Sequence, residues 1–319
     1  MAATARGWYV GKTVNANTLF TRPMLTRTHL RSGHRAAIYD LQPTPGGFYS
    51  AAADGYLVHW HRDDVDFGRV VATVENGKFL ALTATDDGLV AGTLDGGVHW
   101  LYPDAPDRNR HVAHHRRGTF SVLRTGDHVY TAGGDGTLTR WSIATGRTEE
   151  SLPLSTNSLR RIAYDPIYHR LAVGSSEGKL FLIDGRSFTV IGTSPAHPPS
   201  VFALDFSADG EYLFSGGRDA TLARWHVLNG TLRQEQQVTA HLMTVNALAV
   251  HPSGDYLATA SRDKTVKLWR THDLQLLKVC EVVRDKGHVN SVNTLCWLDA
   301  ATLITAGDDR RVLEWHLER

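Results

Sequence analysis

Residues 259–269 read TASRDKTVKLW, and the chain contains four close variants of this phrase. They are SAAADGYLVHW at residues 50–60, TAGGDGTLTRW at 131–141, SGGRDATLARW at 215–225 and TAGDDRRVLEW at 305–315. Each variant places an acidic residue in a tight-turn position and ends in tryptophan. With two weaker copies, these acids recur every 40 to 46 residues, at Asp54, Asp95, Asp135, Glu177, Asp219, Asp263 and Asp309. A repeat of about 40 to 45 residues that ends in an aromatic is typical of four-stranded propeller blades, so we expect seven blades.

The sixth repeat shows how each unit divides into strands. Residues 245–250 (VNALAV), 256–261 (YLATAS) and 265–270 (TVKLWR) are short runs separated by the turn residues HPSGD and RDK. Short runs with period-two alternation between turn residues indicate strands rather than helices. Residues 274–282 (LQLLKVCEV) supply a fourth strand. Because no convincing amphipathic helix of three turns occurs, the sequence predicts an all-β protein.

The repeats resemble the WD40 family over residues 25–317. The residues that carry the resemblance are pairs at the unit starts, Gly33-His34, Ala240-His241 and Gly287-His288, and tryptophans at the unit ends, Trp60, Trp141, Trp225, Trp269 and Trp315. Most units end in Trp-His, Trp-Ser or Trp-Arg where the family has Trp-Asp. The resemblance implies a seven-bladed β-propeller in which each tryptophan ends a third strand.

The way the ring closes follows from this register. Only four residues follow Trp315, so the seventh blade lacks a fourth strand of its own. Residues 22–31 (RPMLTRTHLR) precede His34 and have no earlier strand to join. We therefore expect them to pair with the LEWHL strand, complete the seventh blade and protect an edge that would otherwise promote aggregation. The expected organisation is an N-terminal extension, residues 1–21, followed by one propeller domain, residues 22–319.

Four repeats contain a full set of His, Ser or Thr, Asp and Trp. The sets are His34, Ser50, Asp54 and Trp60; His197, Ser215, Asp219 and Trp225; His241, Thr259, Asp263 and Trp269; and His288, Thr305, Asp309 and Trp315. Ser, His and Asp together also suggest a hydrolase, but four identical active sites in one domain are implausible. The resemblance implies instead a structural network, in which Asp holds His, His meets the hydroxyl, and the hydroxyl accepts the indole N–H. Each such bond contributes roughly 1 kcal/mol net.

The other three repeats depart from this pattern. The third keeps Thr131, Asp135 and Trp141, and its histidine is either His114 or His115. The second has Glu75 and Ala91 in the His and hydroxyl positions, and its Trp100 comes one residue early; the fourth has Ser155, Val173, Glu177 and Ile183. Blades two and four are expected to depend on apolar packing and to be locally less stable.

The resemblance also implies where a partner docks. In WD40 proteins, residues three and five places after the His and the one before the turn Asp face the central opening. The large or polar residues at these positions are Tyr39, Arg160, Phe202, Arg218, Asn246, Arg262, Asn293 and Asp308; blade two offers Lys78, Leu80 and Leu94, and blade three offers Thr119, Ser121 and Gly134. Three arginines beside two aromatics suit an acidic or phosphorylated peptide, whereas a solvated polar rim is the simpler alternative.

Composition limits the other functions. The net charge is +1, from 34 basic and 33 acidic residues, which gives no general attraction to nucleic acid or to an anionic membrane. Cys280 and Cys296 fall on an outer and an inner strand, too far apart to pair, so a reducing compartment is favoured. The start of the chain lacks the apolar stretch of a secretory signal, and we expect a cytoplasmic location. The tight cluster His111, His114 and His115 has no carboxylate at ligand spacing beside it, so no metal and no cofactor are predicted.

The sequence therefore favours a non-catalytic scaffold or adaptor that docks a peptide or protein partner on one face of the propeller. One alternative is an RNA- or ribonucleoprotein-associated subunit, for which the basic stretch Arg108-Asn109-Arg110-His111 and the pair Arg116-Arg117 are the contact candidates. Another is a propeller enzyme with a ligand or metal in the channel, which would need converging carboxylates or histidines there.

Overall fold

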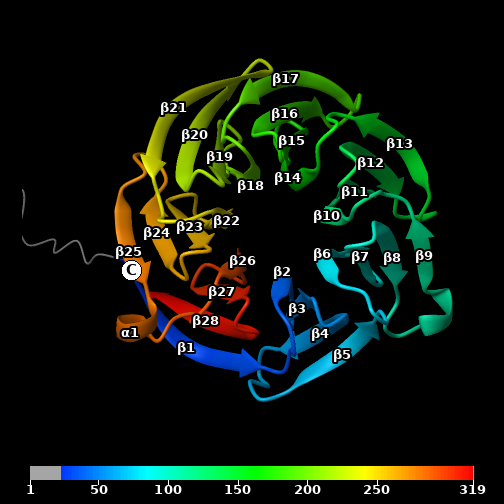
Figure 1. Cartoon of the computed structure of the whole chain (residues 1–319), viewed down its shortest axis with the longest axis horizontal. Helices are drawn as coiled ribbons and strands as arrows, with labels where there is room; N and C mark the ends of the chain where they lie inside the picture. Colours follow the sequence, from blue (N-terminus) through cyan, green and yellow to red (C-terminus); the bar gives the residue numbers. More distant parts are fainter. Residues whose placement is uncertain (1–22, 319) are drawn as a thin grey trace, which may run out of the picture.

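Seven four-stranded sheets surround a central opening in the computed structural model, which describes residues 23–318 (Figure 1). Every strand pairs antiparallel with its neighbours in the sheet. Each sheet is one blade, with its first strand at the opening and its fourth strand at the outer edge. The prediction of an all-β, seven-bladed ring is confirmed.

The first four blades run consecutively along the chain. Their strands are β2 (Ile38–Thr44), β3 (Gly47–Ala52), β4 (Tyr56–His61) and β5 (Gly68–Thr73) in blade 1; β6 (Phe79–Ala84), β7 (Leu89–Thr93), β8 (Gly97–Leu101) and β9 (Arg110–Ala113) in blade 2; β10 (Thr119–Thr125), β11 (His128–Gly133), β12 (Thr137–Ser142) and β13 (Thr148–Pro153) in blade 3; and β14 (Leu159–Asp165), β15 (Arg170–Ser175), β16 (Lys179–Asp184) and β17 (Thr189–Pro195) in blade 4.

The last three blades follow the same order until the ring closes. Their strands are β18 (Val201–Phe206), β19 (Tyr212–Gly217), β20 (Thr221–Leu228) and β21 (Thr231–Thr239) in blade 5; β22 (Val245–Val250), β23 (Tyr256–Ser261), β24 (Val266–Arg270) and β25 (Leu276–Cys280) in blade 6; and β26 (Val292–Trp297), β27 (Thr302–Gly307), β28 (Arg311–Glu318) and β1 (Met24–Ser32) in blade 7. Two short helical turns, a 3-10 turn at Pro106–Arg108 and α1 (Val282–Asp285), complete the described elements.

Burial rises from the rim of each blade to its middle. All the residues of β7, β15 and β27 are buried, whereas the outer strand β13 is almost wholly exposed. In the third strand β12, Leu138, Thr139 and Trp141 are buried and Arg140 is partly exposed. Both faces of this strand are therefore largely covered, as expected for a strand that packs between neighbouring blades.

The hydrophobic core consists of seven clusters, most of them between neighbouring blades. One cluster joins blades 6 and 7 and contains Leu268, Trp315 and Leu317 together with Leu25 of β1. Trp60, Trp141, Trp225 and Trp315 are among the largest fully buried side chains. The tryptophan that ends each strong repeat is thus part of the packing that holds adjacent blades together.

Strand β1 closes the ring. It pairs antiparallel with β28 from Met24 opposite Glu318 to Ser32 opposite Arg311, with a register shift between Arg27 and His29. Figure 1 shows β1 lying beside β28 at the outer edge of blade 7. The expected closing strand is therefore present, and it leaves no unpaired edge on β28.

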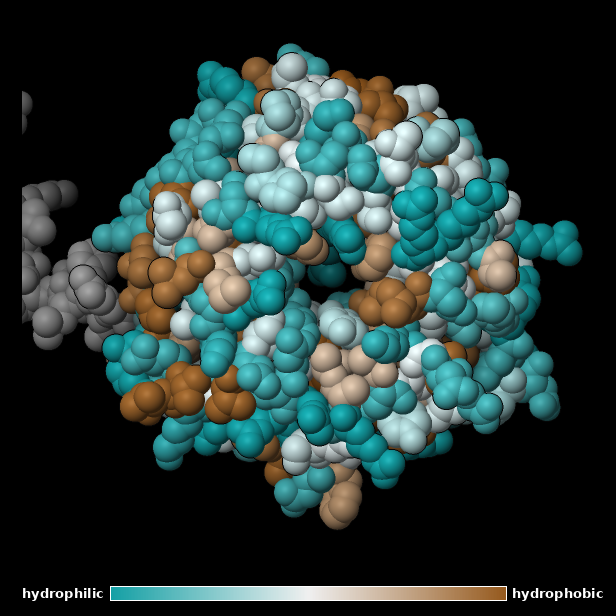
Figure 2. Space-filling view, viewed as in Figure 1, coloured by the Kyte–Doolittle hydropathy of each residue, from teal (hydrophilic) through white to brown (hydrophobic). Residues whose placement is uncertain are grey.

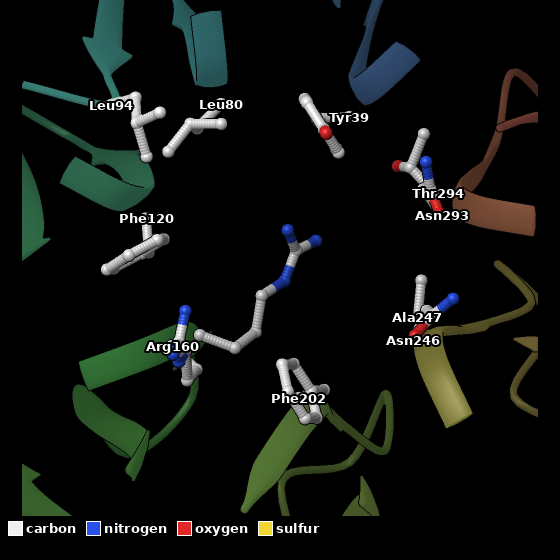
Figure 3. Close-up of a pocket in the computed structure, with 11 residues that line it drawn as sticks. Tyr39, Leu80, Leu94, Phe120, Arg160, Phe202, Asn246, Ala247, Asn293 and Thr294 are labelled. Carbon is white, nitrogen blue, oxygen red and sulfur yellow. The ribbon is translucent and has the colours of Figure 1, made fainter. Parts of the chain in front are cut away.

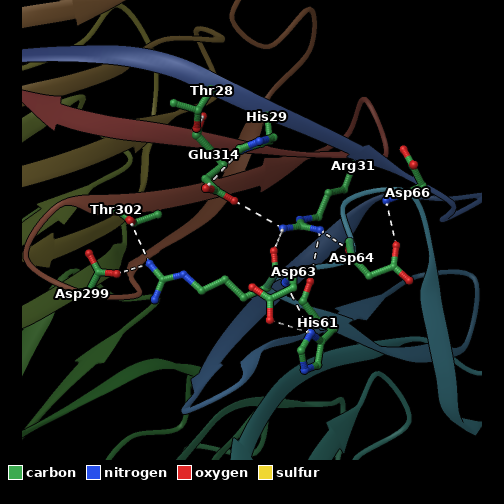
Figure 4. Close-up of polar contacts among 11 residues, drawn as sticks. Thr28, His29, Arg31, His61, Asp63, Asp64, Asp66, Asp299, Thr302 and Glu314 are labelled. Atoms are coloured by element: carbon green, nitrogen blue, oxygen red, sulfur yellow. Dashed lines mark hydrogen bonds and ion pairs between the residues drawn. The ribbon is translucent and has the colours of Figure 1, made fainter.

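A buried arginine on β1 also ties blade 7 to blade 1. Arg31 is 2% exposed and donates hydrogen bonds to the carbonyl oxygens of Asp64, at 2.6 Å, and His61, at 3.3 Å. These carbonyls lie in the turn between β4 and β5, and the Arg31 guanidinium is also 3.4 Å from the Glu314 carboxylate of β28 (Figure 4). One side chain thereby connects the closing strand, its sheet partner and the next blade.

The expected N-terminal extension, residues 1–21, lies outside the described residues. Cys280 on β25 and Cys296 on β26 are both free. Within residues 23–318, no helix has the length and apolar character needed to cross a membrane.

Candidate protein-interaction face

One face of the ring, here called the top face, carries the starts of the inner strands and the turns between the second and third strands. In blade 1, His34 Nδ1 lies 2.9 Å from Asp54 Oδ2 and His34 Nε2 lies 2.7 Å from Ser50 Oγ. The indole N–H of Trp60 donates to the same Ser50 oxygen at 2.8 Å. All these groups are satisfied when His34 is neutral with its proton on Nδ1, because Ser50 then donates to Nε2 and accepts from Trp60.

Blades 5, 6 and 7 repeat this arrangement. The His–hydroxyl distances there are 2.7, 2.8 and 2.8 Å, and the Trp–hydroxyl distances are 2.7, 2.8 and 2.9 Å. The histidine side chains are fully buried beside their aspartates. With the hydroxyl buried between two rings and no open space before it, the group is placed to hold strands together rather than to attack a substrate.

Blade 3 resolves the alternative that its sequence left open. His115, not His114, occupies the network position, with Nδ1 3.1 Å from Asp135 and Nε2 2.7 Å from Thr131 Oγ1. Trp141 donates to Thr131 at 2.9 Å. His114 Nε2 instead lies 2.8 Å from Oγ1 of Thr139, which is on β12 of blade 3.

Blade 2 has a different network, which the sequence pattern did not indicate. Thr93 Oγ1 lies 2.5 Å from Asp95 Oδ1 and 3.2 Å from His99 Nε2, and the His99 ring lies against that of His111. Burial lowers the pKa of His99 to about 4, and the neighbouring His111 acts in the same direction. In blade 4 the corresponding core positions are apolar, with Val173 and Ile183 both fully buried.

The inner strands enclose a pocket of about 350 Å³ at the central opening. Five of the eight residues expected at the docking site line it: Tyr39, Arg160, Phe202, Asn246 and Asn293. Figure 3 shows Arg160 between the rings of Phe120 and Phe202, with Asn246 and Asn293 on the opposite wall. In the space-filling view, mostly hydrophilic residues and a few hydrophobic ones border the opening (Figure 2).

The expectation for blade 3 was wrong by one position. Thr119 and Ser121 are buried, at 0% and 2% exposure, and Ser121 Oγ accepts a hydrogen bond from the Ile162 backbone N–H. The pocket residue of this blade is Phe120. Counting five places from His114 gives Thr119 and counting from His115 gives Phe120, so the ambiguity between the two histidines accounts for the choice of Thr119.

The Arg160 guanidinium is stacked on aromatic rings and has no carboxylate beside it. Its Cζ lies 4.2 Å from the centroid of the Phe120 ring and 5.6 Å from that of Phe202. Desolvation by burial lowers the pKa of Arg160, and its buried Nε has no hydrogen-bond partner among the described residues. A partly desolvated cation without a counter-ion is unfavourable, and an incoming anion would relieve this.

A second arginine in the pocket, Arg161, was missed by the sequence reading. Strict alternation would point consecutive strand residues to opposite faces. The pairing of β14 with β15 shifts register between Leu159 and Arg161, however, and Arg160 and Arg161 both line the pocket. A register shift occurs near the start of all seven inner strands. Its recurrence in every repeat is the feature from which a second pocket residue in β14 could have been predicted.

The remaining three expected residues lie on the surrounding turns. Arg218 and Arg262 are exposed, and within residues 23–318 neither side chain has a hydrogen-bond or ion-pair partner. Asp308 is exposed too, but its Oδ1 accepts a hydrogen bond from Asn293 Nδ2 at 2.7 Å. The rim therefore offers free guanidinium groups, while its carboxylate is engaged with the pocket wall.

Two carboxylates of the inner strands accept hydrogen bonds from backbone N–H groups, and one of them, Asp40, is also ion-paired with Arg161 of the pocket at 3.8 Å. Asp40 accepts the N–H groups of Leu41 and Leu82, and Asp205 accepts those of Phe206 and Val250. Each thus bridges two blades. Burial raises the pKa of Asp40, and it raises that of Asp205 to about 6.

The repeat type is settled by comparison with known families. A family model described as WD domain, G-beta repeat, matches residues 188–226, 232–270 and 279–316, which lie in β17 and the last three blades. These three segments are WD40 repeats. The four earlier blades of the propeller have the same strand order in the structure.

Parts of this propeller are similar to curated proteins. It is 28% identical over 93 residues to WD repeat-containing protein 91 homolog of Dictyostelium discoideum, which covers 29% of this chain and 12% of that protein. It is 26% identical over 115 residues to target of rapamycin complex subunit LST8-1 of Arabidopsis thaliana, or 36% and 38% of the two chains. It is 28% identical over 123 residues to pre-rRNA-processing protein IPI3 of Meyerozyma guilliermondii, or 34% and 27%. The chain thus spans well under two thirds of each relative.

Proposed function

We propose that this propeller is a non-catalytic scaffold that docks an acidic or phosphorylated peptide of a protein partner on its top face. The observation that carries the proposal is the set of guanidinium groups without carboxylate partners, Arg160 in the pocket and Arg218 and Arg262 on the rim. Guanidinium forks match carboxylate and phosphate oxygens, and the aromatic rings of Tyr39 and Phe202 supply rigid apolar contact.

Two further observations support a binding role over catalysis. The Ser, Thr and His groups that could act as nucleophile and base are buried in hydrogen-bonded networks. Asp40 and Asp205 use their oxygens on backbone N–H groups, and within the described residues no three His, Cys, Asp or Glu side chains are grouped to hold a metal ion. The name of one relative, a subunit of a target of rapamycin complex, is in keeping with assembly into a larger complex.

The test is affinity purification from the native cell with wild-type protein and a variant carrying Arg218→Ala, Arg262→Ala and Phe202→Ala. We expect the variant to lose partners that the wild type retains, with an unchanged circular dichroism spectrum. The matched control changes Arg147 and Arg186, exposed arginines at turns between third and fourth strands, and should keep all partners. An identical partner set on the folded triple variant would refute top-face docking.

RNA association is the second candidate, and one relative is named as a pre-rRNA-processing protein. The structure offers it less support than the sequence did. Arg108 is paired with Asp87 at 2.8 Å and stacks on Tyr102, and Arg110 donates to the carbonyl of Gly146 in blade 3. Among the arginines proposed as RNA contacts, the exposed pair Arg116-Arg117 is the one that remains available to a phosphate group. Retention on RNA that falls steeply with added salt and is lost in an Arg116→Ala/Arg117→Ala variant would favour this candidate.

A further inference from the structure

Two consecutive arginines on one inner strand are the feature that extends the proposed function. Among the pocket residues, β14 alone supplies cations, and it supplies two, Arg160 and Arg161. The register shift between Leu159 and Arg161 directs both side chains to the pocket. Positive charge is therefore concentrated on one wall of the pocket.

The two arginines occupy different levels of the pocket. Arg160 stays at its own wall, held between Phe120 and Phe202. Arg161 crosses the opening, because its Nη1 lies 3.8 Å from Asp40 Oδ1 of β2, a strand on the opposite side of the ring (Figure 1). A side chain that enters from the top face would meet the edge of Arg160 first and the Arg161 guanidinium behind it.

Neither guanidinium has a hydrogen-bond acceptor among the described residues. The Asp40 contact is an ion pair at a distance too long for a hydrogen bond, and the oxygens of Asp40 already accept two backbone N–H groups. Guanidinium N–H groups that face a pocket without acceptors are the arrangement that oxyanions satisfy in proteins.

We propose that the central pocket holds the phosphoryl group of a phosphorylated serine or threonine in the docked peptide, with Arg160 and Arg161 as its two ligands. This inference rests on the proposed function. A carboxylate offers two acceptor oxygens and one negative charge, whereas a phosphoryl group offers three acceptor oxygens and a charge of about −1.5 to −2 at pH 7. The phosphoryl group is therefore the better match for two guanidinium groups.

The size and the rim of the pocket fit the same occupant. A cavity of about 350 Å³ is at the lower end of the roughly 300 to 1,000 Å³ of small-molecule sites, which suits one modified side chain rather than a length of backbone. Arg218 and Arg262 lie on the turns above it, where they can contact acidic residues flanking the phosphorylated one. The amide of Asn246 is held in place by the Val292 carbonyl at 2.8 Å, so the opposite wall is preorganised.

The experiment uses the full chain and three degenerate peptide libraries that share random flanks and differ at one central residue: phosphoserine, glutamate or serine. Binding is measured by fluorescence anisotropy, with inorganic phosphate as competitor. We expect the phosphoserine library to bind at least about tenfold more tightly than the glutamate library, since the phosphoryl group brings a larger negative charge and one more acceptor oxygen to the two guanidinium groups. Arg160→Gln should remove most of this binding, and Arg161→Gln should abolish the preference for phosphoserine over glutamate.

The controls separate this inference from the proposed function. Arg160→Lys keeps the charge without the fork and should recover only part of the affinity, while Arg147→Gln should bind like wild type; equal unfolding midpoints establish that the variants are folded. If all three libraries bind alike, peptide docking stands and the phosphoryl site is refuted. If no library binds, both are refuted. If inorganic phosphate binds but the libraries show no preference, the site belongs to a small phosphorylated molecule and the peptide reading is overturned.

Discussion

Asp263 shows at the scale of one residue what the repeated polar network contributes. Its carboxylate accepts hydrogen bonds from His241, from Thr265 Oγ1 at 2.6 Å and from the Leu242 backbone N–H at 3.0 Å. Together these hydrogen bonds hold the pKa of Asp263 well below its usual range, against the effect of desolvation. The side chain is only 6% exposed, so water cannot replace a hydrogen bond that is lost there.

We predict that Asp263→Asn lowers the free energy of unfolding by about 1 to 3 kcal/mol, because the amide nitrogen faces a donor and leaves a buried hydrogen bond unmade. Urea unfolding followed by tryptophan fluorescence measures the change. The matched control is Glu177→Gln in blade 4, where the turn acid is partly exposed and contacts Ser155 and Lys179. It should change the unfolding free energy by no more than about 0.5 kcal/mol; equal losses in the two variants would contradict the prediction.

Buried histidines predict how stability changes with pH. Burial lowers the pKa of both His99 and His115 from 6.5 to about 4, so the unfolded chain binds more protons than the folded one between these values. Stability must therefore fall as the pH drops from about 6.5 toward 4. Asp40 and Asp205 act oppositely, since burial raises their pKa values and lets the folded state bind a proton first. Burial also lowers the pKa values of His59, His114 and His241, which act in the same direction as His99 and His115.

The measurement is the thermal unfolding midpoint at pH 7.5, 6.0 and 5.0 for wild type and His115→Asn. We expect the wild-type midpoint to fall with the pH, and the variant to show a shallower fall from a lower starting value. Parallel curves would show that His115 does not contribute to the pH dependence.

At the residue scale, the sequence could predict which side chains form the network in four blades, because spacing from the turn acid is fixed by strand length. It could not choose between His114 and His115, which fit two loop lengths equally well. It also could not find Arg161, because the irregular register of β14 breaks the two-residue alternation on which such predictions depend. The substitute network of Thr93, Asp95 and His99 lies within one blade and matches no repeated spacing.

The element whose loss should matter most is the closing strand β1. Leu25 is 1% exposed and packs in the cluster that contains Trp315 and Leu317, whereas the adjacent Met24 is 48% exposed. The two positions share a strand and differ in burial, which makes them a matched pair.

We predict that Leu25→Ala destabilises the protein by about 2 to 5 kcal/mol through lost apolar contact and a residual cavity. Met24→Ala should stay within about 0.5 kcal/mol of wild type, as expected of an exposed site. Both values come from urea unfolding. A similar effect of the two substitutions would mean that β1 is not packed on the propeller in solution.

The positions of the strands were the easiest feature to predict, because turn residues separate the strands at a regular interval in every blade. The expected strand over residues 22–31 corresponds to the observed Met24–Ser32. The hydrogen bonds of Arg31 to the β4–β5 turn were beyond prediction, since they depend on carbonyl groups whose positions no side-chain pattern encodes.

At the scale of the whole molecule, the ring is expected to unfold as a unit because its clusters join neighbouring blades. We predict that a variant lacking residues 1–32 exposes the edge of β28 and associates through it, since an unpaired strand edge is a template for another chain. Light scattering coupled to size exclusion measures the mass. A variant lacking residues 1–21 is the control, because it keeps β1, and it should elute with the mass of the wild type. A monomeric, equally stable protein without residues 1–32 would contradict the role given to β1.

The same pairing has a consequence for biosynthesis. Thr28 Oγ1 donates a hydrogen bond to the carbonyl oxygen of Glu314, 286 residues later in the chain. During synthesis, β1 therefore remains unpaired until the final blade has left the ribosome. Individual blades can form earlier as domain-like units, but the ring stays open through nearly all of translation. Chaperone protection of the nascent chain should therefore be needed longest at β1, which is made first and finds its partner strand last.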